Sequence, residues 1–256
     1  MLELKNICVS FRSERQEKIF GTTRTQVLFD VCLSVPQGTC LGILGESGSG
    51  KSTLINLIPR FYDVTSGSIK IDGIDVRDFN IKTLRSKIGF IRQKTLLFTG
   101  SIKSNIKFGK RKASHEEMVH SAKVAQAYDF INKKEKKFDE PIGEGGSNVS
   151  GGQKQRLSIA RALVRKPEIY IFDDSFSALD FKTDAKLRKA INTELKESTL
   201  LIVAQRISTI MNADQIIVLD EGKIVGKGTH KELMNNCEVY QQIALSQLSK
   251  EELENE

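Results

Sequence analysis

The sequence predicts an α/β fold, in which a mainly parallel sheet flanked by helices carries an N-terminal antiparallel β subdomain and an inserted α-helical subdomain. Two observations support this class. Short apolar runs suited to buried strands occur at residues 40–44, 168–173, 199–203 and 215–219. Stretches of helical character follow or separate them at 52–60, 151–165 and 183–197. Such alternation is typical of parallel strands covered by helices on both faces.

Two parts of the chain depart from this alternation. Residues 1–38 and 65–74 have the pattern of short strands and turns, with expected reversals at Gly67 and at Asp72-Gly73. Residues 101–140 are helical in character, and a capping box begins one helix there at Ser114. We therefore expect one domain over residues 2–245, with a helical subdomain of about 95–165 inserted in its core. The acidic tail, 246–256, is expected to fray.

Composition excludes several classes of protein for the chain as given. Its 256 residues are 39% hydrophobic and 28% charged, a globular balance without an apolar run of membrane-spanning length or a secretion signal. The four cysteines form no CxxC pair, which favours reduced thiols and argues against a zinc site or disulfide framework. The net charge of +7 comes largely from lysine clusters at 103–112 and 133–137. A solvated face explains them best, and an anionic membrane surface or RNA remains an alternative.

A phosphate-binding loop is predicted between the first buried strand and the first helix. Residues 45–53 match the pattern GxxxxGK[ST]. The glycines let successive N–H groups point inward, and the helix adds the positive end of its dipole. The predicted nucleotide ligands are Gly45, Glu46, Ser47, Gly48, Ser49, Gly50, Lys51, Ser52 and Thr53. Among them, Lys51 should reach the β- and γ-phosphates and the Ser52 hydroxyl should ligate Mg²⁺. The core is thus expected to be of the P-loop NTPase type.

A second metal contact is predicted at the end of another strand. Asp173 closes the apolar run 168–173, at the carboxyl edge of the expected sheet. An acid there is often only a turn residue. Beside a P-loop it is placed to hold Mg²⁺ directly or through water.

Between these two motifs, Ser150, Gly151, Gly152 and Gln153 open a helix. With the order of the other motifs, they make the chain resemble the nucleotide-binding domain of ATP-binding cassette (ABC) transporters over residues 2–245. The resemblance implies ATP and Mg²⁺ as cofactors, with Gln93 touching the metal and the attacking water and Phe11 stacking on adenine. It also implies that these four signature residues bind the γ-phosphate of an ATP held by a second cassette. Two ATP molecules are then sandwiched between head-to-tail domains.

Further motifs resemble the exporter branch of this family, among them residues 60–63, 65–68, 84–86, 97–98 and 143–145. This implies the transmembrane domains of an exporter as partners, a position at the cytoplasmic face of the cell membrane and no specific nucleic acid. The chain has no such helices of its own, so we expect either an excised domain or a separately encoded subunit. Residues 12–26 are longer than the family's usual turn, and no role is assigned to them.

Two positions depart from the family pattern, and both belong to the hydrolytic apparatus. Asp174 stands where the family has a Glu that polarises the attacking water, and Gln205 replaces the His of the switch loop. Asp is one methylene shorter, and Gln cannot carry imidazolium charge. The predicted catalytic residues are therefore Asp174, Gln205 and Gln93, and the predicted metal ligands are Ser52, Gln93 and Asp173.

The combination favours an ATPase that binds ATP well and cleaves it poorly. We expect the degenerate half of a heterodimeric exporter, whose partner is a non-identical cassette with Glu and His at the catalytic positions. The alternatives are a ribosome- or DNA-associated ATPase of the same type and a regulatory ATP-binding module. Residues 93–150 leave room only for a small helical subdomain, which argues against the first alternative.

Overall fold

A computed structural model of the chain describes residues 1–12 and 24–247. They form two compact units, one made of residues 1–12, 24–85 and 201–247 and the other of residues 86–200. The architecture confirms the predicted α/β class with its antiparallel β part and its helical part. Most of the segment 12–26 and nearly all of the tail 246–256 lie outside the described residues.

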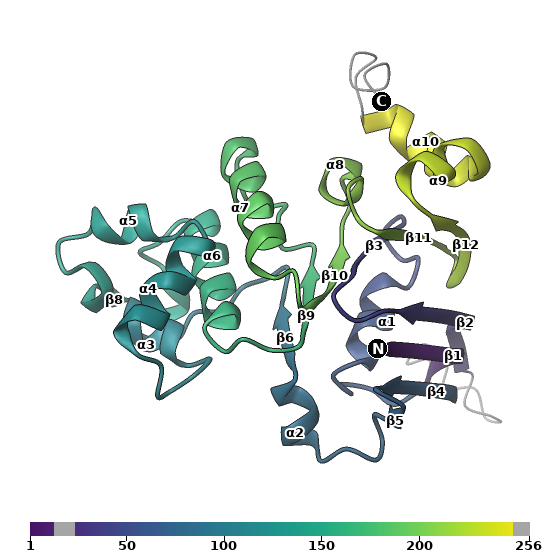
Figure 1. Cartoon of the computed structure of the whole chain (residues 1–256), viewed down its shortest axis with the longest axis horizontal. Coiled ribbons are helices and arrows are strands. Elements are labelled where there is room, and N and C mark those ends of the chain that lie inside the picture. Colours follow the sequence, from purple (N-terminus) through teal and green to yellow (C-terminus); the bar gives the residue numbers. More distant parts are fainter. Residues whose placement is uncertain (13–23, 248–256) are drawn as a thin grey trace, which may run out of the picture. The chain divides into compact units, whose positions relative to one another are not determined.

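The first unit contains a four-stranded antiparallel sheet with the order β2-β1-β4-β5 (Figure 1). Its strands are β1 (Leu2–Arg12), β2 (Arg24–Val35), β4 (Ser66–Ile71) and β5 (Ile74–Asp75). Asp72 and Gly73 form the predicted reversal, both with positive φ (51° and 82°), as a tight hairpin turn requires. The prediction for Gly67 was wrong, because this residue lies inside β4. A Cβ there would lie 2.4 Å from the carbonyl oxygen of Asn6, so glycine permits the close approach of β1.

The rest of the first unit holds the strand and helix of the phosphate-loop motif. β3 (Cys40–Leu44) pairs in parallel with β11 (Gln215–Asp220), which pairs in turn with antiparallel β12 (Lys223–Gly228). The helices are α1 (Lys51–Leu57), α2 (Ile81–Ser86, which ends at the boundary), α8 (Ile207–Ile210), α9 (His230–Asn236) and α10 (Glu238–Gln247). α1 is shorter than the predicted 52–60, because Pro59 cannot continue a helix and Arg60 has a left-handed φ of 54°.

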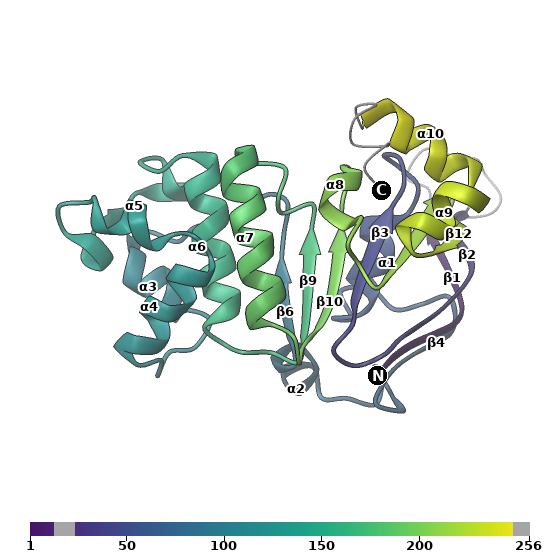
Figure 2. The same cartoon turned by 45° about the horizontal axis from the view of Figure 1, so that its top comes forward.

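The second unit combines a parallel strand pair with a group of helices. β6 (Ile88–Ile91) pairs with β9 (Ile169–Asp173), and the short strands β7 (Gly100–Ser101) and β8 (Pro141–Ile142) pair with each other. The helices are α3 (Ile102–Lys107), α4 (His115–Val124), α5 (Tyr128–Asn132), α6 (Gly151–Leu163) and α7 (Phe181–Glu194). α3 and α4 lie beside α6, as Figure 2 shows. β10 (Thr199–Val203) leads the chain back into the first unit.

Local sequence signals explain where the helices of the second unit begin and end. The predicted capping box is present: the Glu117 amide donates to Ser114 Oγ, and the Ser114 amide donates to the Glu117 carboxylate. α6 and α7 end two and three residues before their predicted ends. Just after the end of α6, Lys166 adopts a left-handed φ of 54° directly before Pro167, which a helix does not accommodate.

Candidate nucleotide site

The loop between β3 and α1 has the backbone that phosphate binding requires. Gly45, Gly48 and Gly50 all have positive φ (152°, 89° and 100°). At Gly45 a Cβ would lie 2.2 Å from the carbonyl oxygen of Leu219 on β11, so a side chain is excluded there. Gly50 occupies the N-cap of α1 without a side-chain cap. Because glycine has no side chain, Gly50 gives the first turn of α1 no cap of the kind that Ser or Asp provides, and such a helix N-terminus is suited to an anion.

Lys51 lies over this loop with its ammonium group folded back onto it. Its Nζ donates to the carbonyl oxygens of Gly45 and Glu46, each at 2.6 Å, and to Ser49 Oγ at 3.4 Å. The side chain is 9% exposed. Phosphate oxygens are acceptors of the same kind and also carry charge. With Ser52 exposed on the next helical position, these residues fit a nucleotide phosphate.

The second unit brings two of the predicted catalytic residues together. Gln93 follows β6, Asp174 follows β9, and Gln93 Nε2 donates to Asp174 Oδ2 at 2.6 Å. Asp173 ends β9 and is half-buried, as the prediction of a strand-end acid requires. The parallel pairing of β6 and β9 explains the proximity, because the carboxyl ends of parallel strands lie at the same sheet edge.

The backbone around Asp174 is fixed in an uncommon conformation. Asp174 has φ of 45°, a left-handed value that Asp tolerates better than most residues. Ser175 Oγ donates to the carbonyl of Ile91 at 2.9 Å, and Ser177 Oγ donates to that of Asp174 at 2.9 Å. These contacts hold the loop that follows Asp174.

The signature residues form the start of α6. Ser150 is its N-cap, and its Oγ accepts from the Gln153 amide at 3.3 Å while the Ser150 amide donates to Gln153 Oε1 at 3.2 Å. This capping box gives Ser150 and Gln153 a local structural role. Gly151 is exposed, and a Cβ there would meet nothing within 4 Å. The N-terminus of a helix with an open glycine is suited to receive an anion.

Two side chains of α6 that the sequence did not indicate hold the loop at residues 92–96, which follows β6 and carries Gln93 and is called the glutamine loop below. Buried Gln155 donates from Nε2 to the carbonyl of Arg92 at 3.2 Å and accepts from Thr95 Oγ1. Arg161 donates to the carbonyl of Leu96 at 3.0 Å, and burial lowers the pKa of its guanidinium to about 10. Both partners lie more than 55 positions away along the chain. Nothing in the local pattern could have revealed them.

Gln205 follows β10 in the first unit, at the start of the short helix α8. Its side chain is exposed, and the preceding residue, Ala204, donates its amide to the carbonyl of Ile43 on β3 at 3.2 Å. A Cβ on Gly42 of the same strand would lie 2.8 Å from Ile210 Cβ. The switch loop and α8 therefore pack directly on the strand that leads into the phosphate loop.

Phe11 has an aromatic partner within the first unit. Its ring contacts Tyr62 edge to face, with the ring centroids 5.5 Å apart. Phe11 pairs with Thr25 of β2, a few positions from Leu28, which touches Gly50.

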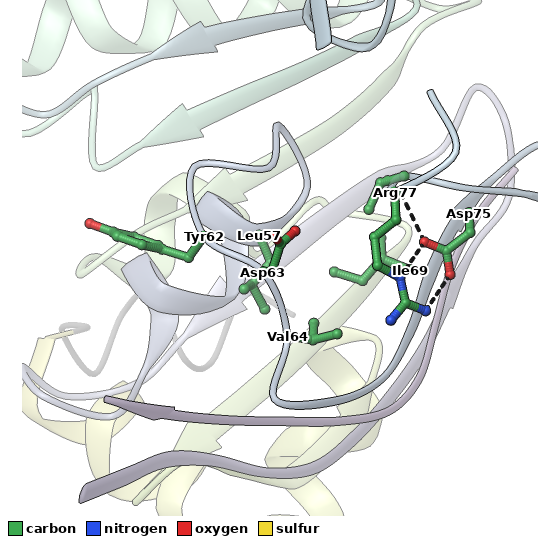
Figure 3. Close-up of a pocket in the computed structure, with 8 residues that line it drawn as sticks. Leu57, Tyr62, Asp63, Val64, Ile69, Asp75 and Arg77 are labelled. Carbon is green, nitrogen blue, oxygen red and sulfur yellow. Dashed lines mark hydrogen bonds and ion pairs between the residues drawn. The ribbon is translucent and has the colours of Figure 1, made fainter. Parts of the chain in front are cut away.

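Tyr62 also lines a small pocket, together with Leu57, Ile69 and the ion pair between Arg77 and Asp75 that Figure 3 shows. In that pair, hydrogen bonds from Arg77 lower the pKa of the Asp75 carboxyl.

No group of three or more His, Cys, Asp or Glu side chains gathers as a cation site within the described residues. A nucleotide-bound Mg²⁺ needs no such cage, because phosphates and water fill most of its ligand positions. A hydroxyl, an amide oxygen and one carboxylate, which are the groups of Ser52, Gln93 and Asp173, fit that donor set. Across residues 1–12 and 24–247, no helix has the length and apolar character needed to cross a membrane.

The fold and these loops define a P-loop nucleotide-binding domain with a signature helix. The family model described as ABC transporter matches residues 28–177, and the chain belongs to this family. Proteins of two Staphylococcus aureus strains, NCTC 8325 and bovine RF122, are each 46% identical over 224 residues, covering 88% of this chain and 39% of the relative. Both are provisionally named as multidrug export ATP-binding/permease proteins.

A solved structure of a bacterial Atm1-family ABC exporter with ATP bound is also similar. It has a TM-score of 0.90 and 34% identity, and the match covers 97% of this chain and 42% of that chain. The chain thus spans about two fifths of the length of the proteins it matches.

Proposed function

We propose that this chain is an ATP-binding and weakly ATP-hydrolysing subunit or domain that powers an ABC exporter. It would do so by closing head to tail on a second, non-identical cassette when ATP is bound. The observation that carries the proposal is the contrast between an intact phosphate loop and the two replacements, Asp174 and Gln205, among the catalytic positions. Residues 2–245 would act as one cassette with the helical insertion at about 95–165, and 246–256 as a tail.

ATP and Mg²⁺ are assigned to the residues predicted from the sequence. The loop Gly45–Thr53 would hold the phosphates, with Lys51 neutralising charge on the β- and γ-positions. Ser52, Gln93 and Asp173 would hold the metal, which screens phosphate charge when bound. Phe11 would stack on adenine, for which its half-buried ring beside Tyr62 gives support.

Weak hydrolysis follows from the reach of the Asp174 carboxylate. Asp is one C–C bond shorter than Glu, about 1.5 Å. A displacement of about 1 Å at a catalytic group can cost on the order of a hundredfold in rate. The hydrogen bond from Gln93 adds support, because it already occupies one oxygen of this carboxylate, Oδ2, at 2.6 Å. Gln205 can donate a hydrogen bond to the γ-phosphate but cannot add positive charge.

The second cassette is inferred from the signature. Ser150, Gly151, Gly152 and Gln153 present an exposed helix N-terminus. In a head-to-tail dimer they would bind the γ-phosphate held by the partner's phosphate loop. The partner should carry Glu and His where this chain has Asp174 and Gln205. This chain would then hold one ATP as a clamp and donate a working signature to the hydrolysing site.

Contact with transmembrane domains is supported by an apolar surface next to the glutamine loop. Leu96, Phe98 and Phe108 are exposed (73%, 48% and 58%), and the centroids of the two aromatic rings lie 4.6 Å apart. Exposed apolar groups that lie together mark interaction sites more often than solvent faces. We assign this surface and the loop at 143–145 to the membrane domains. The chain would then work at the cytoplasmic face of the membrane, without specific contact to nucleic acid.

Two substitutions in the assembled heterodimer test the asymmetric model. Ser150→Arg should abolish most of the ATPase activity, because it places bulk and charge at the γ-phosphate of the competent site. Asp174→Asn should cost much less, since that carboxylate is not expected to support turnover. Steady-state ATPase assays compare the two. An equal or larger loss with Asp174→Asn would instead indicate a symmetric pump with an unusual catalytic Asp.

A further inference from the structure

The short helix α8 begins without a cap from its own sequence. Its N-cap residue, Arg206, makes no side-chain capping hydrogen bond, and Arg has no acceptor with which to make one. The amide of Ile207 nevertheless has a partner, the Oε1 atom of Gln247, at 2.9 Å. Gln247 is the last residue of α10, 40 positions further along the chain.

The same side chain holds a second point of the switch loop. Gln247 Nε2 donates to the backbone carbonyl of Gln205 at 2.8 Å. The Ile207 amide can only donate and the Gln205 carbonyl can only accept, so the two partners fix the orientation of the Gln247 amide. One glutamine side chain therefore bridges the residues on either side of Arg206.

α10 is held in place by buried side chains and by hydrogen bonds to α9. Tyr240 and Ala244 are fully buried, and the Tyr240 hydroxyl contacts His230 Nδ1 of α9 at 2.6 Å. Gln241 Nε2 donates to the carbonyl of Met234 at 2.7 Å. Ile207 and Ile210 of α8 are buried as well, and Ile210 lies against Gly42 of β3. Two elements that are each held by the core are thus joined at the switch loop.

We propose that Gln247 is a positioning residue for ATP hydrolysis, which fixes the backbone that carries Gln205 beside the phosphate loop. The bridge binds the backbone of residue 205, so it works equally for Gln or His at that position. Its effect should fall on the hydrolytic step and spare ATP binding, because none of its contacts involves the phosphate loop. The role in hydrolysis rests on the proposed function, whereas the bridge does not.

The first test measures hydrogen exchange of peptides covering residues 204–211 in the full chain without nucleotide. Each lost hydrogen bond corresponds to about fivefold in a local opening equilibrium, so Gln247→Ala should speed exchange there by about tenfold or more. Gln242→Ala, an exposed glutamine on the same helix, is the matched control and should leave exchange unchanged. Gln247→Glu keeps the acceptor and loses the donor, and it should give an intermediate rate.

The second test is kinetic and uses the chain with Asp174→Glu and Gln205→His, in which hydrolysis is expected to be faster. Adding Gln247→Ala should lower kcat about tenfold with the KM for ATP changed less than about twofold, and Gln242→Ala should change neither. Unaltered exchange, or a KM change without a kcat change, would overturn the inference. Absence of ATP binding by the wild-type chain in calorimetry would overturn the proposed function and leave the exchange test intact.

Discussion

At the scale of single residues, the groups proposed to bind the nucleotide follow the family pattern, whereas two of the groups proposed for catalysis, Asp174 and Gln205, depart from it. Lys51 is held by loop oxygens at 2.6 Å, while Asp174 is engaged by Gln93 at 2.6 Å. The loop oxygens hold the Lys51 ammonium group where phosphate is proposed to bind. The hydrogen bond from Gln93 occupies one oxygen of the Asp174 carboxylate, which is proposed to orient water. Binding and hydrolysis are thus expected to respond to different substitutions.

Restoring the family residues should raise the rate of hydrolysis. Asp174→Glu extends the carboxylate by one methylene, and we expect about tenfold or more in kcat for the chain assayed at high concentration. Adding Gln205→His should raise kcat further, because both groups act on one transition state. The control is Asp129→Glu, the same change at an exposed carboxylate, and it should leave kcat unchanged. A wild-type rate already equal to that of the double variant would show that Asp174 is adequate.

At the scale of elements, the helical part of the second unit depends on one buried amide. Asn105 of α3 is 1% exposed and makes four hydrogen bonds. It donates to the carbonyls of Phe98 and Ser101, and it accepts from the Phe98 amide and from Arg161. α3 is thereby tied to the chain that follows the glutamine loop and to α6.

Asn105→Leu should destabilise the protein by about 2–4 kcal/mol, because it leaves several buried donors and acceptors unsatisfied. Chemical denaturation followed by circular dichroism measures the free energy of unfolding. Lys103→Ala on the same helix is the control and should stay within about 0.5 kcal/mol, since its ion pair is exposed. A loss for Asn105→Leu no larger than that of the control would contradict the structural role of this amide.

At the scale of the whole molecule, nucleotide binding should add to the stability of the fold. A ligand at about 100 times its Kd contributes about 2.7 kcal/mol, which corresponds to a rise in Tm of about 5–10 °C for a chain of this size. Wild type and Asp174→Asn should both show this rise with Mg-ATP, because their binding residues are intact. Lys51→Ala should lose it. Thermal unfolding followed by the fluorescence of an added dye measures Tm, because the chain has no tryptophan. An equal rise in Tm for Lys51→Ala would place ATP elsewhere.

The fold class could be predicted because its signals are local. Apolar runs over 168–173 and 199–203, the P-loop pattern and the capping box at Ser114 each lie within a few residues, so that spacing alone identifies them. Errors arose where tertiary contacts decide the conformation. Gly67 is inside a strand because the backbone of β1 approaches it closely.

The amino-acid pattern alone indicates which groups are suited to phosphate and metal, and which two positions, Asp174 and Gln205, depart from the family pattern. These are properties of residue type and order. The side chains that support those groups become visible only in the folded chain: Gln155 binds the glutamine loop, Asn105 binds the chain that follows it, and Gln247 bridges the switch loop. A polar side chain carries no local sign of its partner when the partner lies dozens of residues away. Its role is set by the burial and satisfaction of backbone groups, which exist only once the chain has folded.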